Sequence, residues 1–172
     1  VWDIMREQAY GRIVVTTSSS GLYGNFGQTN YGAAKLGVIG LMNTLVLEGA
    51  KYDIRVNGLA PTAGTRMTEG LIPEKAFDLL TPETVTPGVL YLVSEDAPNK
   101  TILCAGAGAY AVSKIVETDG AWLPVEEQTP EGIAAHWDQI TATEGEKVPQ
   151  AGFEQTIKFT GKAAAGLGIS LD

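Results

Sequence analysis

Apolar stretches and helical patterns alternate along the first two thirds of the chain. Residues 12–17 and 54–60 are rich in β-branched and apolar residues, and residues 101–111 are apolar and glycine-rich. The first run lacks polar alternation, which is typical of a strand covered on both faces in a parallel sheet. We predict strands at 12–17, 54–60 and about 101–107, with the first in a central position.

Helical spacing of apolar residues separates the predicted strands. Residues 1–10 have the pattern of a helix end that stops at a glycine, and a long helix is expected from a cap at Thr29 or Asn30 to about Ala50. Further helical pieces are predicted at three places, namely 66–80, 82–94 and 131–141. Strands that alternate with helices indicate an α/β fold.

The last third of the chain has a weaker pattern. Residues 109–122 form short alternating pieces around Asp119-Gly120, which is a turn signal. Beyond Glu144 the composition becomes polar and then rich in glycine and alanine. We expect an irregular C-terminal extension there, with a tail that docks on another chain.

Small residues form a stripe on the long predicted helix. Ala33, Gly37 and Gly40 lie at positions i, i+4 and i+7, and each interior glycine costs about 1 kcal/mol relative to alanine. A smooth stripe permits close approach of another element, which offsets that cost. The sequence leaves open whether that element belongs to the same chain or to a second subunit.

Composition excludes several classes of function. The 172 residues carry a net charge of −8, so a nucleic-acid-binding surface is not expected. The single cysteine, Cys104, excludes an internal disulfide, fits a reducing compartment and is expected to be a buried small hydrophobe. The single histidine, His136, excludes a histidine-rich metal cluster and disfavours a Ser-His-Asp triad.

Membrane and export signals are not expected either. The longest apolar run, Leu36 to Leu47, is too short to span a bilayer, and the first residues lack the pattern of a signal peptide. We expect a cytoplasmic protein without a membrane partner.

Candidate chemistry gathers around the first predicted strand and the helix after it. Tyr31 and Lys35 are four residues apart, which places both side chains on one helix face. A positive charge beside a phenol favours the phenolate, so Tyr31 can exchange a proton. Ser18 stands thirteen residues before Tyr31 at a strand exit, where ligands of open α/β sheets bind. A Tyr-x-x-x-Lys pair alone is more often part of a helix surface than of a catalytic site. The position of Ser18 at the strand exit is what favours a catalytic site here.

Ser18, Tyr31 and Lys35 have the spacing of the catalytic residues of the short-chain dehydrogenase/reductase family, which this sequence resembles. The runs 18–28 and 57–68 are similar to one subgroup, the (3R)-hydroxyacyl-CoA dehydrogenase domain of peroxisomal multifunctional enzyme type 2 and its bacterial relatives. The resemblance is dense over about residues 1–95 and thins out afterwards. It implies a doubly wound parallel-sheet Rossmann-type domain.

The resemblance also implies roles for individual residues. Tyr31 would exchange the proton with the substrate oxygen, and Lys35 would assist it and bind the nicotinamide ribose. Ser18 would hydrogen-bond the substrate oxygen, with Ser20 also among the substrate-binding residues. The loop after the second strand would hold the nicotinamide carboxamide and a nearby phosphate, through Thr62, Ala63, Gly64 and Thr65. Family members usually have Pro-Gly at this loop, whereas here Pro61 is followed by Thr62, so a plain turn is the alternative.

One expected motif is missing. A dinucleotide site of this class needs a glycine-rich turn after the first strand, and no such turn precedes Tyr31. The run Gly106-Ala107-Gly108-Ala109 comes too late and is not followed by a helix with a downstream acidic residue. We interpret the chain as the C-terminal half of the domain, with residues 1–110 as the catalytic half and 111–172 as a family-type extension. The predicted strand at 12–17 would then lie at a bare edge of the sheet. This edge is expected to pair with the missing N-terminal half or a second copy.

The sequence therefore predicts the catalytic half of an oxidoreductase that transfers a hydride between NAD(P) and a 3-hydroxyacyl or 3-oxoacyl thioester. The resemblance favours NAD, a homo-oligomer and, in a eukaryote, a peroxisomal location. One alternative is an NADPH-dependent 3-oxoacyl reductase that uses the same residues. An alternative of another class is a non-catalytic structural fragment, because the 172 residues alone would lack the adenosine half of the cofactor site.

Overall fold

The computed structural model describes residues 1–65, 70 and 73–171. The chain divides into two compact units, Val1–Ser113 and Lys114–Asp172. Each unit is described by itself. Most of the residues predicted to carry chemistry lie in the first.

A four-stranded sheet forms the centre of the first unit. Its strands are β1 (Gly11–Thr16), β2 (Ile54–Pro61), β3 (Ile102–Gly106) and β4 (Ala109–Ser113), in the order β1-β2-β3-β4. The first three are parallel, as the apolar runs predicted, and β4 is antiparallel to β3. The predicted α/β architecture is confirmed.

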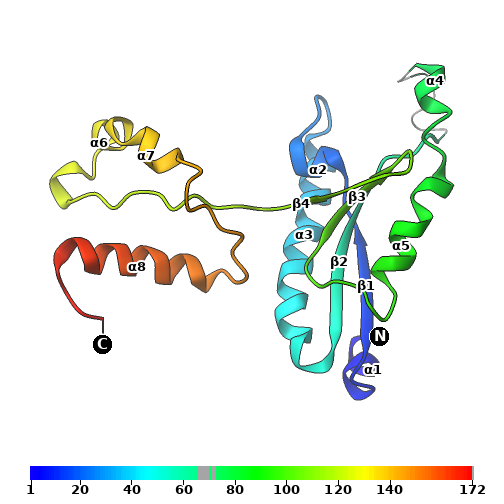
Figure 1. Cartoon of the computed structure of the whole chain (residues 1–172), viewed down its shortest axis with the longest axis horizontal. Helices are drawn as coiled ribbons and strands as arrows, with labels where there is room; N and C mark the ends of the chain where they lie inside the picture. Colours follow the sequence, from blue (N-terminus) through cyan, green and yellow to red (C-terminus); the bar gives the residue numbers. More distant parts are fainter. Residues whose placement is uncertain (66–69, 71–72, 172) are drawn as a thin grey trace. The chain divides into compact units, whose positions relative to one another are not determined.

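Helices cover both faces of this sheet (Figure 1), with α3 (Thr29–Gly49) on one side and α5 (Thr86–Leu92) on the other. Successive residues of β1 point to opposite faces, as strand geometry requires. Ile13 and Val15 pack with the α3 side, whereas Val14 packs with the α5 side. This arrangement explains why the strand lacks polar alternation.

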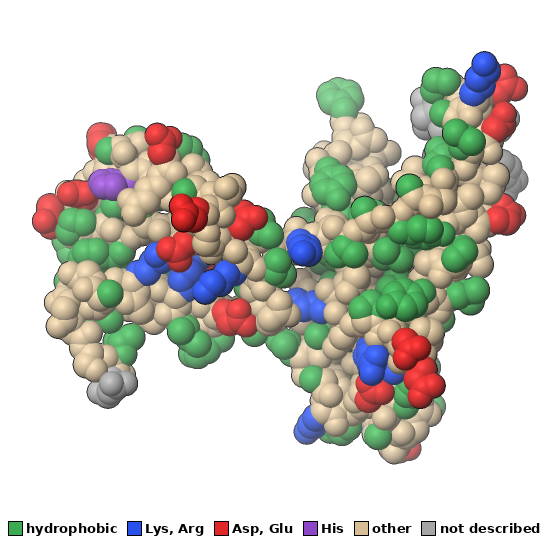
Figure 2. Space-filling model, viewed as in Figure 1, with side chains coloured by type: hydrophobic (Ala, Val, Ile, Leu, Met, Phe, Trp, Pro, Cys, Tyr) green, Lys and Arg blue, Asp and Glu red, His purple; other side chains and the backbone are tan. Residues whose placement is uncertain are grey.

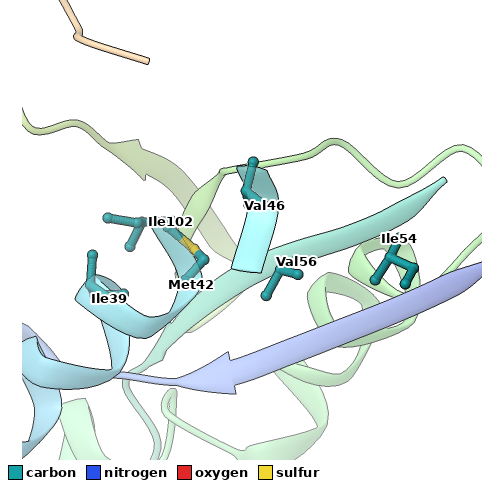
Figure 3. Packing of buried hydrophobic residues seen from close by; sticks show 6 residues of the cluster. All are labelled: Ile39, Met42, Val46, Ile54, Val56 and Ile102. Carbon is teal, nitrogen blue, oxygen red and sulfur yellow. The ribbon is translucent and has the colours of Figure 1, made fainter. Parts of the chain in front are cut away.

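The larger core cluster lies between α3 and the sheet. Burial of each of these side chains contributes roughly 1.5–3 kcal/mol of hydrophobic stabilisation. Figure 3 shows the six buried residues, which come from α3, β2 and β3: Ile39, Met42, Val46, Ile54, Val56 and Ile102. The cluster fixes α3, and hence its first two turns, relative to the strand ends.

The apolar, glycine-rich run at 101–111 folds back on itself. Ala107 and Gly108 have φ angles of 50° and 75°, so the chain makes a tight turn between β3 and β4. Two consecutive positive φ angles are the signature of a type I′ hairpin. The run Gly106-Ala107-Gly108-Ala109 is thus a hairpin connection, in agreement with its exclusion as a dinucleotide motif.

The outer edge of β1 is unpaired in the described part of the chain, as predicted for the strand at 12–17. Among the described residues β1 pairs with β2 and is the outermost strand of the sheet. A central position for this strand would need a further strand that the described part of the chain does not supply. The backbone groups on that edge are therefore open to pairing.

Several predicted helix bounds are adjusted by the structure. The N-terminal helix α1 covers Trp2–Glu7, and α3 begins at Thr29 after Gln28 rather than after a side-chain cap. The region 82–94 contains a 3₁₀ turn, η2 (Pro82–Thr84), followed by α5. Of the helix predicted at 66–80, α4 covers Glu74–Phe77, and residues 66–69 and 71–72 lie outside the described residues.

Two smaller elements were not predicted. A short helix, α2 (Ser19–Tyr23), lies in the connection between β1 and α3, and a 3₁₀ turn, η1 (Ala50–Tyr52), follows α3. With η1, α3 spans Thr29–Tyr52 and is long and apolar enough to cross a membrane by length and composition. Its inner face packs on the sheet, and a core helix of a soluble protein passes the same test.

The second unit is helical. It contains a 3₁₀ turn, η3 (Val125–Glu127), and the helices α6 (Pro130–Ala135), α7 (Trp137–Thr141) and α8 (Phe153–Leu167). The single helix predicted at 131–141 is broken at His136, and α8 corrects the expectation of an irregular tail. Hydrophobic side chains lie at the surface of both units (Figure 2), and Ala164 is the buried residue of the described part of this unit.

Contacts distant in sequence hold α8 in place. Lys158 pairs with Glu117, and Lys162 Nζ lies 2.6 Å from Asp119 Oδ2. The Lys158 and Gln155 side chains hold the pKa of the Glu117 carboxyl below its ordinary value, and Lys162 does the same for the pKa of Asp119. Local sequence patterns do not show these pairs.

Candidate active site

Ser18 lies two residues beyond the end of β1 and caps α2. Its Oγ accepts a hydrogen bond of 3.2 Å from the backbone N–H of Ser20. This is a normal use of serine at a helix start. Because the oxygen acts as the acceptor in this bond, the hydroxyl proton of Ser18 is not used by it and can be donated to a substrate oxygen.

Tyr31 and Lys35 lie on successive turns at the start of α3. The Lys35 ammonium nitrogen is 5.7 Å from the centre of the Tyr31 ring, and the Tyr31 side chain is partly exposed. Lys35 Nζ also donates a hydrogen bond of 3.0 Å to the carbonyl oxygen of Thr16, the last residue of β1. The ammonium is therefore positioned between the tyrosine ring and the carboxyl end of the strand.

Two glycines allow α2 and α3 to pack closely. A Cβ atom on Gly21 would lie 2.7 Å from Cβ of Lys35, and one on Gly32 would lie 3.2 Å from the carbonyl oxygen of Ser20. Distances below 3.0 Å are not tolerated by real side chains, so Gly21 is required for this packing. The contacts join the Ser18 helix to the Tyr31 and Lys35 helix.

The predicted cofactor loop, Thr62–Thr65, follows the carboxyl end of β2, just as Ser18 follows the carboxyl end of the parallel strand β1. The N–H of Thr62 donates to the carbonyl of Ala105 at 2.8 Å, and the N–H of Gly64 donates to that of Leu80 at 2.5 Å. These two backbone donors are thus used within the chain. Ala63 packs against the α5-side core cluster.

Packing also explains the glycine in this loop. A Cβ atom on Gly64 would lie 3.1 Å from the ring and the carbonyl oxygen of Phe77. Gly106 similarly accommodates Thr62, whose carbonyl oxygen would be 2.6 Å from an added Cβ. The loop therefore has structural reasons for its sequence besides the predicted role in cofactor binding.

Sequence reasoning missed three polar groups near these residues. The Thr16 carbonyl binds the Lys35 ammonium, and the buried Thr17 hydroxyl donates to the Lys35 carbonyl at 2.6 Å. Oε1 of Gln28 is buried and lacks a hydrogen-bond partner in the described part of the chain. The sequence did offer a sign of the Thr17 contact, because a threonine that directly follows an apolar strand has a hydroxyl available for a hydrogen bond.

The donor set at the start of α3 fits part of a nicotinamide cofactor. An ammonium and a phenol hydroxyl beside a strand's carboxyl end are suited to binding ribose hydroxyls. The amides of Thr62 and Gly64 are already occupied, so the loop would contribute other groups.

The family model for short chain dehydrogenases matches residues 1–76 of this chain. Residues 1–76 thus have the sequence pattern of the short-chain dehydrogenase family. The segment includes β1, Ser18, the Tyr31 and Lys35 pair, β2 and the loop that follows it. The resemblance on which the sequence interpretation rested is confirmed.

Individual relatives extend the similarity beyond this dehydrogenase segment. A short-chain type dehydrogenase/reductase of Mycobacterium tuberculosis is 50% identical over 154 residues, which are 89% of this chain and 53% of that protein. Peroxisomal multifunctional enzyme type 2 of Mus musculus is 45% identical over 158 residues, 90% of this chain and 22% of that protein. Acetoacetyl-CoA reductase of Rhizobium meliloti is 39% identical over 109 residues, 56% of this chain and 45% of that protein.

A solved structure agrees with these relatives. Full-length peroxisomal multifunctional enzyme type 2 from Drosophila melanogaster has a TM-score of 0.82 and 34% identity, covering 96% of this chain and 31% of that one. This chain thus spans about half the length of its M. tuberculosis relative and smaller parts of the multifunctional enzymes.

Proposed function

We propose that this chain carries the catalytic half of an NAD(P)-dependent oxidoreductase that acts on 3-hydroxyacyl or 3-oxoacyl thioesters. The observation that supports it most is the Lys35 ammonium beside the Tyr31 ring at the exit of β1, within a dehydrogenase segment. The thioester class rests on the relatives named acetoacetyl-CoA reductase. The N-terminal half, as a separate chain or second copy, would supply the rest of the cofactor site.

Each of the three side chains has one task in the proposed oxidation. Tyr31 accepts the proton of the substrate hydroxyl, with the Lys35 ammonium 5.7 Å from the centre of its ring. Ser18 donates its hydroxyl proton to the substrate oxygen and so stabilises the charge that develops on it. Tyr31 and Lys35 would hold the nicotinamide, which would supply the hydride-accepting chemistry of the reaction.

We assign to the substrate contacts Ser18, Ser20 and Tyr31, and to the cofactor contacts Tyr31, Lys35 and the loop Thr62–Thr65. NAD is the proposed nicotinamide, as the resemblance implies. The proposed location is the cytoplasm, or the peroxisome if the host is a eukaryote, because several relatives carry peroxisomal names.

A second candidate is the reverse activity, an NADPH-dependent 3-oxoacyl reductase. It is favoured by the acetoacetyl-CoA reductase relatives. The same three residues would operate, with Tyr31 now donating the proton to the substrate oxygen. A structural fragment without catalysis is the third outcome that the experiment distinguishes.

The test is a nicotinamide absorbance assay on the full-length protein and on the 172-residue chain. The proposal predicts that the full-length protein reduces NAD with a (3R)-hydroxyacyl-CoA faster than it oxidises NADPH with the 3-oxoacyl-CoA. A preference for NADPH would establish the second candidate. Absence of turnover in both directions, in protein that melts cooperatively, would contradict both. The short chain is expected to be inactive alone.

A further inference from the structure

The buried threonine at the exit of β1 has no role in the mechanism above. Thr17 is 1% exposed, and its hydroxyl donates a hydrogen bond of 2.6 Å to the backbone carbonyl of Lys35. The bond crosses from the sheet to the second turn of α3. It therefore joins the exit of β1 directly to the backbone of α3.

The backbone of Thr17 is itself fixed. Its N–H donates a hydrogen bond of 2.8 Å to the carbonyl of Leu59 in β2. The next residue in the chain is Ser18, which caps α2. Thr17 thus lies between the anchored end of the sheet and the serine that would hold the substrate oxygen.

The contact between Thr17 and α3 sets where Ser18 lies relative to Tyr31 and Lys35. Tyr31 and Lys35 are one turn apart on one helix, so their mutual geometry is set by α3 alone. Ser18 belongs to the β1–α2 connection, and its placement relative to that pair depends on how α3 sits against β1. The Thr17 hydroxyl fixes this placement at the residue next to Ser18.

The neighbouring carbonyl adds a second connection at the same place. Thr16 accepts a hydrogen bond from the Lys35 ammonium, while Thr17 donates to the Lys35 backbone. Lys35 is therefore held at both its side-chain end and its main chain by consecutive residues. Removing the Thr17 hydroxyl costs free energy because this partly buried hydrogen bond is lost beside a buried residue.

We propose that Thr17 is a positioning residue for the dehydrogenase reaction, which holds the Tyr31 and Lys35 pair in register with Ser18 through its hydrogen bond to the Lys35 carbonyl. The inference rests on the proposed function. It assigns to Thr17 no contact with substrate or cofactor. Its effect is expected on kcat, since misplaced reacting groups slow the chemical step while the binding contacts remain.

The test compares Thr17→Val, which removes the hydroxyl at nearly constant shape, with Thr17→Ser, which retains it. In the full-length protein we expect Thr17→Val to lower kcat by roughly 10- to 100-fold with KM for the acyl thioester within about twofold. Thr17→Ser should recover kcat to within about threefold of the original protein. Thr160→Val is the matched control, because the Thr160 hydroxyl bonds the Thr156 carbonyl within its own helix, and its kcat should be unchanged.

A crystal structure of the Thr17→Val protein provides a readout independent of turnover. The proposal predicts that Lys35 Nζ no longer lies within hydrogen-bond distance of the Thr16 carbonyl. An unchanged kcat in Thr17→Val, with a lowered melting temperature, would show a purely structural role and overturn the proposal. If instead the original protein shows no turnover while the crystal structure changes as predicted, the proposed function fails and the positioning contact stands.

Discussion

At the scale of single residues, Gly21 shows how closely the two halves of the candidate site are packed. Its α-carbon faces Lys35, and an added Cβ would overlap Lys35 Cβ and approach the Lys35 and Leu36 backbone within about 3 Å. The backbone of α3 cannot move aside as a flexible side chain can. The glycine is thus a requirement of the α2–α3 contact and not of a turn.

We predict that Gly21→Ala separates α2 from α3 and destabilises the protein by about 1–3 kcal/mol, the usual range for overpacking. Activity should fall with it, because Ser18 moves away from Tyr31. Thermal melting and steady-state kinetics are the measurements. Gly161→Ala in α8 is the matched control, since a Cβ there meets open space and an added methyl favours a helix. Equal melting temperatures for the two variants would show that an added Cβ at Gly21 does not clash with Lys35.

At the scale of elements, a charged cluster joins the start of β1, the start of β2 and the loop after α5. Arg12 donates to the Asp53 carboxylate and to the carbonyls of Ser94 and Glu95. Arg55 binds the other Asp53 oxygen at 3.0 Å. The hydrogen bond from Arg12, followed by that from Arg55, holds the pKa of Asp53 below its ordinary value of 3.8.

Because the pKa of Asp53 is lowered in the folded protein, the free energy of unfolding depends on pH. A carboxyl with a lowered folded-state pKa stabilises the protein fully above its unfolded value and loses that contribution as the pH falls through the folded value. We therefore predict that the free energy of unfolding decreases below about pH 4. Asp53→Asn should be less stable at neutral pH and show a weaker decrease, by urea denaturation at pH 7 and pH 3. Asp96→Asn, on the exposed loop after α5, should behave as the original protein; a parallel decrease in all three would disprove the assignment.

The elements that the sequence predicted are those whose pattern is local. The β-branched runs gave β1 and β2 because both faces of these strands are covered, and apolar spacing gave α3. The strand β4 was missed because a reversal within an apolar, glycine-rich stretch leaves no change in hydrophobicity. Helix α8 was missed because Trp122, Glu117 and Asp119 hold it from more than thirty residues away.

The same distinction applies to the candidate site. Ser18, Tyr31 and Lys35 were predicted from a fixed spacing in the sequence, and their assignment as catalytic residues remains a prediction. The roles of Thr17 and Gly21 could not be predicted, because they depend on how α3 lies across the end of β1. The cofactor loop was predicted by analogy, and the structure adds that two of its amides are already bonded.

At the scale of the whole molecule, the outer face of α3 is apolar and open. Leu36, Leu41 and Leu47 are about half exposed, and a Cβ on Gly37 or Gly40 would meet nothing within 4 Å. The small-residue stripe therefore does not pack within the described part of the first unit. An open apolar stripe of this kind can receive a second subunit, and this alternative stays a prediction.

We predict that Leu41→Glu converts a homo-oligomer into a monomer, because a carboxylate in the centre of an apolar interface is left without a partner. Sedimentation of the full-length protein measures the change in mass. Glu48→Gln, an exposed polar change on the same helix, is the control and should leave the mass unaltered. A monomeric original protein, or an oligomer unaffected by Leu41→Glu, would exclude this interface.

The central claim is that Tyr31 transfers the proton in a nicotinamide-dependent reaction. Tyr31→Phe in the full-length protein removes the hydroxyl and retains the ring, so the most direct measurement is turnover of this variant beside its melting curve. We predict a loss of at least about 10²-fold in kcat, as for general acid–base catalysis, with an unchanged melting temperature. Tyr91→Phe, a matched change on exposed α5, should keep full activity. Near-normal turnover of Tyr31→Phe would contradict the account.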